Sequence, residues 1–393
     1  MVYKRRIEED LKSQIKTEEV VILTGMRRTG KTTLMKTILS SVESSNKVFL
    51  DLENPLNRRI FEEKNYDNIL KNLEKVGISS QEKMYVFLDE IQLMSQIPSA
   101  IKYLHDNFDV KFFLTGSSSY YLKNLFSESL SGRKIIFELY PLDFEEYLVF
   151  KGEDSKIAKE FLEKSKNKNE IVFEQRKKYY DEYLRYGGFP GVVLEKDLAQ
   201  KEKKISDIFT SYFEQDVKML ADFRDLSKLR DLIILLAART GSKLEITKLA
   251  SEMGVSRETI YNYLSFLEKT YFIFLISPFS RNSDREVSGA RKVYLCDTGI
   301  LYLLGGASDG SIFENAAFLN LKKYGKINYY QKRSGTEIDF ILNKETGFEV
   351  KNKGNNSDLK KLNRISQSLK LKEYYVVSRK YSEEAGIIIA ADL

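Results

Sequence analysis

A chain of 393 residues is too long for one ordinary domain core, and its length predicts roughly two to four domains. Hydrophobic residues make up 42% of the chain and no apolar run approaches the roughly 18 residues of a membrane span, so a membrane protein is not expected. The single cysteine, Cys296, and the single histidine, His105, exclude internal disulfides and cysteine- or histidine-rich metal clusters. The charged N-terminus lacks the apolar core of a secretory signal, which favours a cytoplasmic location, and the net charge of +6 permits nucleic-acid binding without requiring it.

The first predicted strand, residues 20–24, leads into a glycine-flanked loop, 25–32 (GMRRTGKT), and then into a helical pattern. In this order, backbone N–H groups of the loop and of the helix N-terminus converge on phosphates, and the glycines allow a close approach. Lys31 then reaches the β- and γ-phosphates, and the hydroxyl of Thr32 binds Mg²⁺. The motif therefore predicts a Mg-ATP site whose binding residues are Gly25, Arg28, Thr29, Gly30, Lys31, Thr32 and Thr33.

Further apolar runs alternate with helical stretches, which predicts a parallel sheet buried on both faces. These runs lie at 47–52, 85–88, 112–115 and 135–137. Asp89 and Glu90 follow the second of them, where one carboxylate can hold Mg²⁺ and the next can orient the attacking water. The next run ends beside that centre, so we expect Thr115 or Ser117 to sense the γ-phosphate.

Residues 20–150 resemble an AAA-like ATPase of the additional-strand catalytic-glutamate class. The segments 130–133 (LSGR) and 140–147 (YPLDFEEY) are similar to one prokaryotic family, whose members join this ATPase to a C-terminal domain of unknown function. The resemblance implies that Arg133 touches ATP, either in its own chain or from a neighbouring copy in a homo-oligomer. The alternative is a structural arginine that precedes a strand.

Residues 150–215 are rich in Lys, Glu, Tyr and Leu at helical spacing. The cluster at 186–191 (YGGFPG) interrupts this pattern, ends helices and marks a turn. We interpret the region as a helical lid that covers the nucleotide, and a plain helical linker is the alternative.

A helix-turn-helix pattern follows within an expected winged helix, residues 216–280. Ile260, Leu264 and Leu267 recur at helical spacing and should be buried. The residues left outward, which could enter a DNA major groove, are Ser256, Arg257, Thr259, Asn262 and Tyr263. Since this face carries little positive charge, contact with a protein is an equally open alternative to contact with DNA.

The last region runs strand, strand, strand, helix, strand, after a helix that contains Glu314. These elements are expected at 327–331, 337–342, 348–351, 358–369 and 374–377. Because side chains alternate along a strand, Asp339 on one strand and Glu349 with Lys351 on the next share a polar face. Solvated charges on an edge hairpin would produce the same alternation.

This arrangement resembles the restriction-endonuclease-like fold. The resemblance implies a second metal site for Mg²⁺ or Mn²⁺ on Asp339, Glu349 and Glu314, with Lys351 assisting the nucleophile.

Together the patterns predict an α/β protein in four parts. These are a P-loop AAA-like ATPase domain (1–149), a helical lid (150–215), a winged helix (216–280) and a restriction-endonuclease-like α/β domain (281–393). The expected function is Mg-dependent ATP hydrolysis coupled to action on DNA, with metal-dependent cleavage. The alternative is an ATP-driven switch that recruits a protein partner while the nuclease-like domain is inactive. A transcription regulator that uses only the winged helix is a third interpretation.

Overall fold

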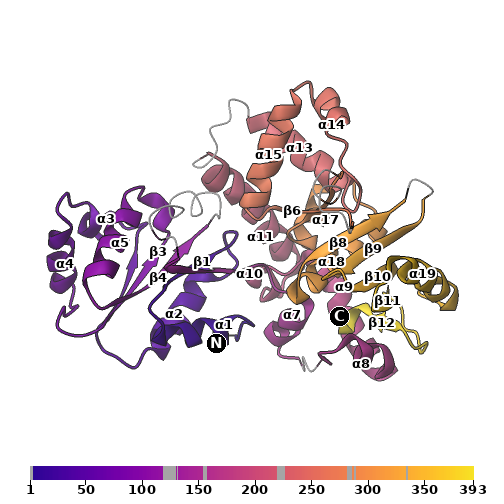
Figure 1. The fold of residues 1–393 in the computed structure, drawn as a ribbon, viewed down its shortest axis with the longest axis horizontal. Coiled ribbons are helices and arrows are strands. Elements are labelled where there is room, and N and C mark those ends of the chain that lie inside the picture. The colour runs from indigo at the N-terminus through magenta and orange to yellow at the C-terminus, as the bar shows by residue number, and fades with distance from the viewer. Residues whose placement is uncertain are drawn as a thin grey trace. The chain divides into compact units, whose positions relative to one another are not determined.

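The computed structural model describes residues 3–117, 130, 132–153, 157–218, 226–280, 286, 289–332 and 335–393. It divides into two compact units (Figure 1). Unit 1 comprises Met1–Tyr140, Ser211–Ala221 and Lys269–Tyr271, and unit 2 comprises Pro141–Thr210, Asp222–Glu268 and Phe272–Leu393. No helix in the described ranges combines the length and apolar character needed to cross a membrane.

Unit 1 is built on a five-stranded sheet in the order β2-β3-β4-β1-β5, and all neighbouring strands are parallel. The strands are β1 (Val20–Thr24), β2 (Lys47–Asp51), β3 (Met84–Asp89), β4 (Val110–Gly116) and β5 (Lys134–Glu138). The predicted parallel α/β sheet is therefore confirmed. Since β4 lies between β1 and β3, the segments that follow these three strands meet at one edge.

Helices cover both faces of this sheet (Figure 1). They are α1 (Glu8–Ser13), η1 (Gln14–Lys16), α2 (Lys31–Ser41), α3 (Pro55–Phe61), α4 (Tyr66–Lys75), η2 (Ile91–Leu93) and α5 (Ile97–Asn107). Successive residues of β1 point to opposite faces, so Val21 and Leu23 share a core cluster with α1 and α2. Val20 and Ile22 belong to the second cluster, with α3, α4 and α5. Both faces are thus apolar, as the near-continuous hydrophobic strands predict.

Unit 2 begins with a series of helices. They are α7 (Phe144–Lys151), α8 (Phe161–Lys166), α9 (Glu170–Tyr186), α10 (Pro190–Val193) and α11 (Leu198–Ser211). The helical character predicted for 150–215 is confirmed, and the position of these helices over a nucleotide stays a prediction. The chain passes from α11 directly into η3, a π-helix over Tyr212–Val217 that belongs to unit 1.

The glycine-proline cluster after α9 packs tightly against a buried carboxylate. A Cβ atom at Gly187 would lie 2.0 Å from Oδ1 of Asp297, and one at Gly188 would lie 2.2 Å from the carbonyl oxygen of Leu142. Asp297 accepts hydrogen bonds from the N–H groups of Gly188, Gly299 and Ile300. The cluster therefore makes room for this contact in addition to ending a helix.

Three helices and an antiparallel strand pair follow in unit 2. They are α13 (Leu226–Ala238), α14 (Ile246–Met253), α15 (Arg257–Lys269), β6 (Ile273–Ile276) and β7 (Lys292–Leu295). Ile260, Leu264 and Leu267 are buried, as predicted. The prediction for Tyr263 is wrong, because the buried stripe of α15 includes it and leaves it only 4% exposed, while Tyr261 is exposed.

The C-terminal part of unit 2 contains a second five-stranded sheet in the order β12-β11-β10-β9-β8. Its elements are α17 (Thr298–Leu304), α18 (Asp309–Leu321), η4 (Lys322–Tyr324), β8 (Ile327–Gln331), β9 (Glu337–Leu342), β10 (Thr346–Lys351), α19 (Asn356–Leu369), β11 (Glu373–Ser378), β12 (Ile387–Ile389) and η5 (Ala390–Asp392). Strands β8, β9 and β10 form an antiparallel meander, whereas β10, β11 and β12 are parallel. The predicted element order is confirmed; β12 was not predicted. Helix α19 links β10 to β11 and packs beside them (Figure 1).

Candidate functional site

Two glycines shape the loop between β1 and α2. A Cβ atom at Gly25 would lie 2.1 Å from the carbonyl oxygen of Leu139, so only glycine fits there. Gly30 caps α2 with a left-handed φ of 97°, which glycine adopts without strain. The unpaired N–H groups of a helix lie at its first turn, so the start of α2 offers donors to an anion in this loop.

Lys31 is buried at the base of the loop. Its Nζ atom donates to the carbonyl oxygens of Gly25, at 2.8 Å, and of Met26, at 3.1 Å. Burial lowers the pKa of Lys31, while the negative charges of Glu90 and Asp216 oppose this shift. A buried cation at a helix start, next to carboxylates, suits a phosphate-binding site.

Asp89, the last residue of β3, forms hydrogen bonds with one residue of α2 and one residue of β4. It is buried, and its Oδ2 atom accepts a hydrogen bond from the Thr32 hydroxyl at 2.7 Å. Its Oδ1 atom accepts one from the hydroxyl of Thr115, whose Oγ1 in turn accepts from the N–H of Glu90 at 3.2 Å. The structure thus brings these four predicted residues together, and the hydroxyl and carboxylate pair of Thr32 and Asp89 fits the ligands that Mg²⁺ takes in such sites.

Glu90 adopts a left-handed backbone conformation with φ of 57°. Such a conformation is uncommon for a residue with a side chain and is found preferentially at functional sites. The Oε2 atom of Glu90 accepts a hydrogen bond from Nε2 of Gln92 and lies 3.9 Å from Nη2 of Arg27. The predicted ATP-binding loop included Arg27 without a role of its own, and Gln92 was not predicted.

The remaining predicted residues of the loop differ in their positions. Thr29 is buried and its hydroxyl donates to the carbonyl oxygen of Met26 at 2.9 Å. Thr33 is exposed on α2, and Arg28 is exposed with its Nη2 atom 3.1 Å from Oγ of Ser211. It is therefore Arg27, not Arg28, that is directed toward Glu90. The binding roles of Arg28, Thr29 and Thr33 stay predictions.

Asp216, on the π-helix η3, is a further member of this site that sequence reasoning missed. Its Oδ1 atom accepts a hydrogen bond from Nε of Arg27 at 3.2 Å, and its side chain is 3% exposed. Burial raises the pKa of Asp216, while Arg27 and Ser117 lower it. Ser117, just after β4, is also buried and interacts with Asp216, so this predicted residue lies at the same centre. No motif surrounds Asp216 in the sequence.

Arg133 does not lie at this centre. Lys134 at the start of β5 pairs with Val20 at the start of β1, whereas the loop follows the end of β1. Arg133 is therefore at the opposite edge of the sheet, where its side chain is 46% exposed and forms an ion pair with Asp106. The expected contact with ATP in its own chain is wrong for this geometry, and contact with a neighbouring copy stays a prediction.

Asp339 and Glu349 form a second buried centre, in unit 2. An Oδ2 atom of Asp339 accepts a hydrogen bond from the N–H of Val350 at 2.7 Å. Burial raises the pKa of Glu349 to about 7, and the negative charge of Asp339 adds to the shift. Burial also raises the pKa of Asp339. The predicted convergence of these two carboxylates is therefore observed.

Lys351 and one oxygen of Glu349 complete the polar face. The Nζ atom of Lys351 lies 2.8 Å from Oε1 of Glu349, and the side chain of Lys351 is partly exposed. The Oε2 atom of Glu349 is buried and has no hydrogen-bond partner in the part of the chain that the structure describes. A buried carboxylate oxygen with no donor is costly unless a cation or proton reaches it, and this fits a metal ligand.

Glu314, on α18, lies close to Asp339 but has its own partners. Burial raises the pKa of Glu314 to about 7, and the charge of Asp339 contributes. Its Oε1 atom accepts a hydrogen bond from the Tyr294 hydroxyl at 2.7 Å and lies 3.8 Å from Nζ of Lys292. Lys292 and Tyr294 on β7 were not predicted, because a Lys-x-Tyr alternation carries no specific signal.

The predicted three-carboxylate metal shell is not formed. Within the ranges that the structure describes, no three His, Cys, Asp or Glu side chains are placed to hold one metal ion. Glu314 is instead held by Tyr294, so it does not close a shell with Asp339 and Glu349. The two remaining carboxylates, with the unpartnered oxygen of Glu349, are the residues that fit a cation here.

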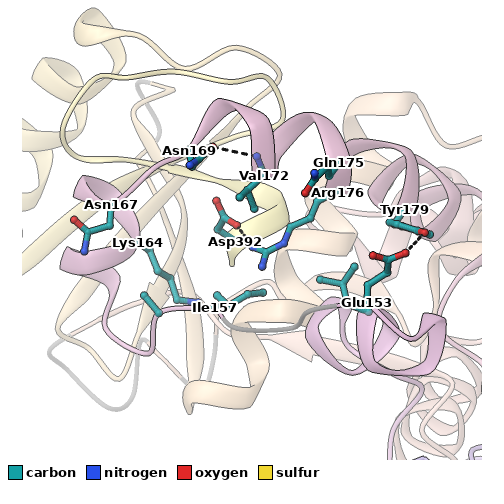
Figure 2. A pocket seen from close by; sticks show the side chains of 12 residues that line it. Glu153, Ile157, Lys164, Asn167, Asn169, Val172, Gln175, Arg176, Tyr179 and Asp392 are labelled. Carbon is teal, nitrogen blue, oxygen red and sulfur yellow. Dashed lines mark hydrogen bonds and ion pairs between the residues drawn. The ribbon is translucent and has the colours of Figure 1, made fainter.

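A polar cavity of about 300 Å³ lies elsewhere in unit 2, and Figure 2 shows the side chains that line it. It lies among α7, α8, α9 and the C-terminal turn, and its charged side chains are already paired. Arg176 forms an ion pair with Asp392, and the Tyr179 hydroxyl donates to Glu153. The described residues that line this cavity include none of the predicted site residues.

Comparisons with known proteins match three regions of the chain. Residues 17–148 match an AAA domain, 177–311 match a domain of unknown function (DUF8612), and 309–389 match a second domain of unknown function (DUF4143). The chain thus joins a P-loop ATPase domain of the AAA type to C-terminal domains whose function is unknown.

Sequence similarity to other proteins extends over most of the chain. An uncharacterized protein of Methanocaldococcus jannaschii is 29% identical over 98% of this chain and 87% of its own length. An uncharacterized protein of Haemophilus influenzae is 27% identical over 94% of this chain and 92% of its own. Among solved structures, a Walker-type ATPase of Pyrococcus abyssi is 15% identical, with a TM-score of 0.48 over 77% of this chain and 96% of its own.

Proposed function

We propose that the chain hydrolyses ATP in unit 1 and acts on DNA, which the C-terminal carboxylate centre cleaves. The AAA domain match and the P-loop sheet support ATP binding and hydrolysis. The observation that carries the cleavage step is the buried pair of Asp339 and Glu349 beside Lys351, in which one oxygen of Glu349 has no partner among the described residues.

For ATP hydrolysis, Lys31 and the N–H groups of the loop bind the phosphates. Thr32 and Asp89 would hold Mg²⁺, which neutralises phosphate charge when bound. Glu90 orients a water molecule, whose oxygen forms a bond to the γ-phosphorus as the bond to the bridging oxygen of ADP breaks. The products are ADP and inorganic phosphate, and the carboxylate of Glu90 accepts the proton that the water releases.

For DNA cleavage, Asp339 and Glu349 would hold a divalent cation. Such an ion supplies an activated water and stabilises charge on the phosphate. Lys351 places an ammonium group beside that water and the phosphate oxygens. The order α18-β8-β9-β10-α19-β11, with a meander followed by a parallel crossover, supports the proposed restriction-endonuclease-like fold.

DNA contact is assigned to the winged-helix elements of unit 2. Arg257 and Asn262 are exposed on α15, and Ser256 is exposed just before it. Three helices with an adjoining antiparallel strand pair are the parts that a winged helix needs. We expect this contact to be largely independent of base sequence, so the affinity for DNA should fall steeply as the salt concentration rises.

The second candidate is an ATP-driven switch that recruits a protein partner without cutting DNA. The absence of a three-carboxylate set among the described residues favours this candidate, as does the ion pair between Lys351 and Glu349. An inactive centre would retain its fold while Lys351 neutralises Glu349.

One assay separates the two candidates. The purified full chain is incubated with duplex or single-stranded DNA, ATP and either Mg²⁺ or Mn²⁺, and both phosphate release and DNA integrity are measured. DNA-stimulated ATPase activity with cleavage supports the first candidate. ATP hydrolysis without DNA binding or cleavage, together with ATP-dependent binding of a protein partner, supports the switch.

A further inference from the structure

Arg27 is surrounded by carboxylates in unit 1. Its Nε atom lies 3.2 Å from Oδ1 of Asp216, its Nη2 atom 3.9 Å from Oε2 of Glu90 and its Nη1 atom 3.8 Å from Oε1 of Glu53. The Arg27 side chain is 16% exposed. One guanidinium group in the phosphate-binding loop thus faces both the predicted catalytic glutamate and a buried aspartate from a distant segment.

Asp216 is placed there by an unusual helix. The π-helix η3 buries Tyr212, Asp216 and Val217 together, and the Tyr212 hydroxyl bonds Oγ1 of Thr270 at 2.7 Å. π-helical turns are rare and occur frequently at functional sites. A nearly fully buried carboxylate destabilises a fold unless it is paired. The ion pair with Arg27 therefore compensates the cost of burying Asp216.

We propose that Arg27 is the arginine that contacts the γ-phosphate, and that Asp216 is a positioning residue that holds Arg27 until ATP binds. This inference rests on the ATP hydrolysis proposed above. Arg27 lies in the same loop as Lys31 and beside Glu90, so its guanidinium group is on the side of the site where water attacks. Arg133, at the far edge of the sheet, does not fill this role within the chain.

The exchange follows from the chemistry of the partners. A terminal phosphate offers several charged oxygens to the planar fork of an arginine, whereas Asp216 accepts through a single oxygen, from Nε. Once on the phosphate, Arg27 stabilises the charge on its oxygens as the bond to ADP breaks. Asp216 then competes with the nucleotide for the same cation.

The first test substitutes Arg27. In Arg27→Ala, kcat should fall on the order of 10²–10³-fold, somewhat below the loss seen when an arginine finger is removed, while the affinity for a fluorescent ATP analogue changes by only a few fold. Arg27→Lys should recover little of the lost rate, because an ammonium group lacks the planar fork. Arg59→Ala, on the exposed side of α3, is the matched control and should hydrolyse ATP at the wild-type rate. Wild-type kcat in Arg27→Ala would overturn the assignment.

The second test substitutes Asp216. Because Asp216→Asn removes the group that competes with the γ-phosphate for Arg27, ATP analogues should bind more tightly, on the order of tenfold, while ADP, which has no γ-phosphate, should bind as it does to the wild type. A merely structural Asp216 would give the opposite result, weaker binding with a lower melting temperature. Glu214→Gln removes an exposed charge from the same helix and should leave both values unchanged. Weaker or unchanged binding of an ATP analogue by a folded Asp216→Asn protein would therefore overturn the exchange.

Failure of the proposed function and failure of the exchange at Arg27 would give different results. If the wild-type chain bound no nucleotide and released no phosphate, the proposed function itself would be wrong. If the wild type hydrolysed ATP and both Arg27→Ala and Asp216→Asn behaved like it, only the exchange between Asp216 and the γ-phosphate would be wrong.

Discussion

The nucleotide site and the carboxylate centre both lie on β-sheets, but they use the sheet differently. In unit 1, β1, β3 and β4 are parallel and end at one edge, where three short segments that each follow a strand meet. In unit 2, Asp339 and Glu349 lie within the adjacent antiparallel strands β9 and β10. A site at strand ends is encoded by compact local motifs. A site on a strand face is encoded by alternation, which any half-exposed strand shares.

The two centres also differ in how their carboxylates are satisfied. Asp89 accepts hydrogen bonds from the hydroxyls of Thr32 and Thr115. Among the residues that the structure describes, Lys351 pairs with one oxygen of Glu349 and no donor reaches the other, and burial and Asp339 raise the pKa of Glu349 to about 7. The negative charge of Asp89 is stabilised by hydrogen bonds from its neighbours. The negative charge of Glu349 is only partly compensated, so ionised Glu349 destabilises the fold.

We expect the largest effects from substituting Lys31 and Glu90 in the nucleotide site, and the two variants should lose different properties. Lys31→Ala should abolish tight ATP binding, because it removes the buried cation under the phosphates. Glu90→Gln should retain binding and lose turnover, since only the positioning of water is affected. Nucleotide binding and phosphate release are measured separately for each variant.

Binding provides an internal control for these variants. At about a hundredfold excess over Kd, ATP should stabilise the fold by about 2.7 kcal/mol, which raises the melting temperature. Wild type and Glu90→Gln should show this rise and Lys31→Ala should not. Turnover at the wild-type rate in Glu90→Gln would place the catalytic carboxylate elsewhere.

The next largest effect is expected from substitutions in the carboxylate centre, which test whether this centre works independently of the nucleotide site. Asp339→Ala and Glu349→Ala should each abolish metal-dependent DNA cleavage and retain ATP hydrolysis, because each centre has its own sheet and its own side chains. Lys351→Ala should weaken cleavage more than metal binding, and Glu314→Ala should have the smallest effect of the four, since Glu314 is held by Tyr294. Cleavage that survives Asp339→Ala would leave the switch as the function.

The sequence predicted most of unit 1 because its chemistry and its strands coincide. The loop at 25–32, the pair Asp89 and Glu90 and the hydroxyls after β4 each follow a buried apolar run, so position in the sequence translates directly into position in space. Asp216 could not be found in this way. It reaches the site through a π-helix far along the chain, and an isolated aspartate in a helical pattern carries no signal.

In unit 2, the sequence predicted the strands better than the side chains on them. Asp339 and Glu349 were placed correctly by alternation, but alternation could not show that Tyr294 and Lys292 take up Glu314 from a strand earlier in the chain. The outward direction of Tyr263 was wrong for a related reason. Helical spacing allows a wider buried stripe than the three leucine and isoleucine positions indicate.

A smaller effect concerns Asp297, a buried carboxylate of unit 2 outside the carboxylate centre. Asp297→Ala should destabilise the fold by about 2–4 kcal/mol, because the buried N–H groups of Gly188, Gly299 and Ile300 lose their acceptor. Chemical denaturation of the full chain measures this loss. A change below about 1 kcal/mol would mean that water replaces the carboxylate.

The smallest expected effect is a stabilisation, in contrast to the loss of stability expected for Asp297→Ala, and it comes from substituting Glu349. Burial and the charge of Asp339 raise the pKa of Glu349 from 4.5 to about 7. The folded chain therefore holds this proton more tightly than the unfolded chain does, so the contribution to stability is full below pH 4.5 and is lost as pH rises through about 7. Glu349→Gln should remove part of this pH dependence, and Asp339 and Glu314 should supply the rest.

At about pH 8, without added metal, Glu349→Gln should raise the free energy of unfolding on the order of 1 kcal/mol, less than the full linkage value because Lys351 loses its ion-pair partner. Glu345→Gln, an exposed carboxylate at the start of β10, is the control and should leave the pH profile unchanged. Stability is measured by denaturation over about pH 5–8. If Glu349→Gln were less stable than wild type at the upper end, Glu349 would be a structural partner of Lys351. The contrast with Asp297 would then disappear, because both buried carboxylates would be retained for the hydrogen bonds and ion pairs they make.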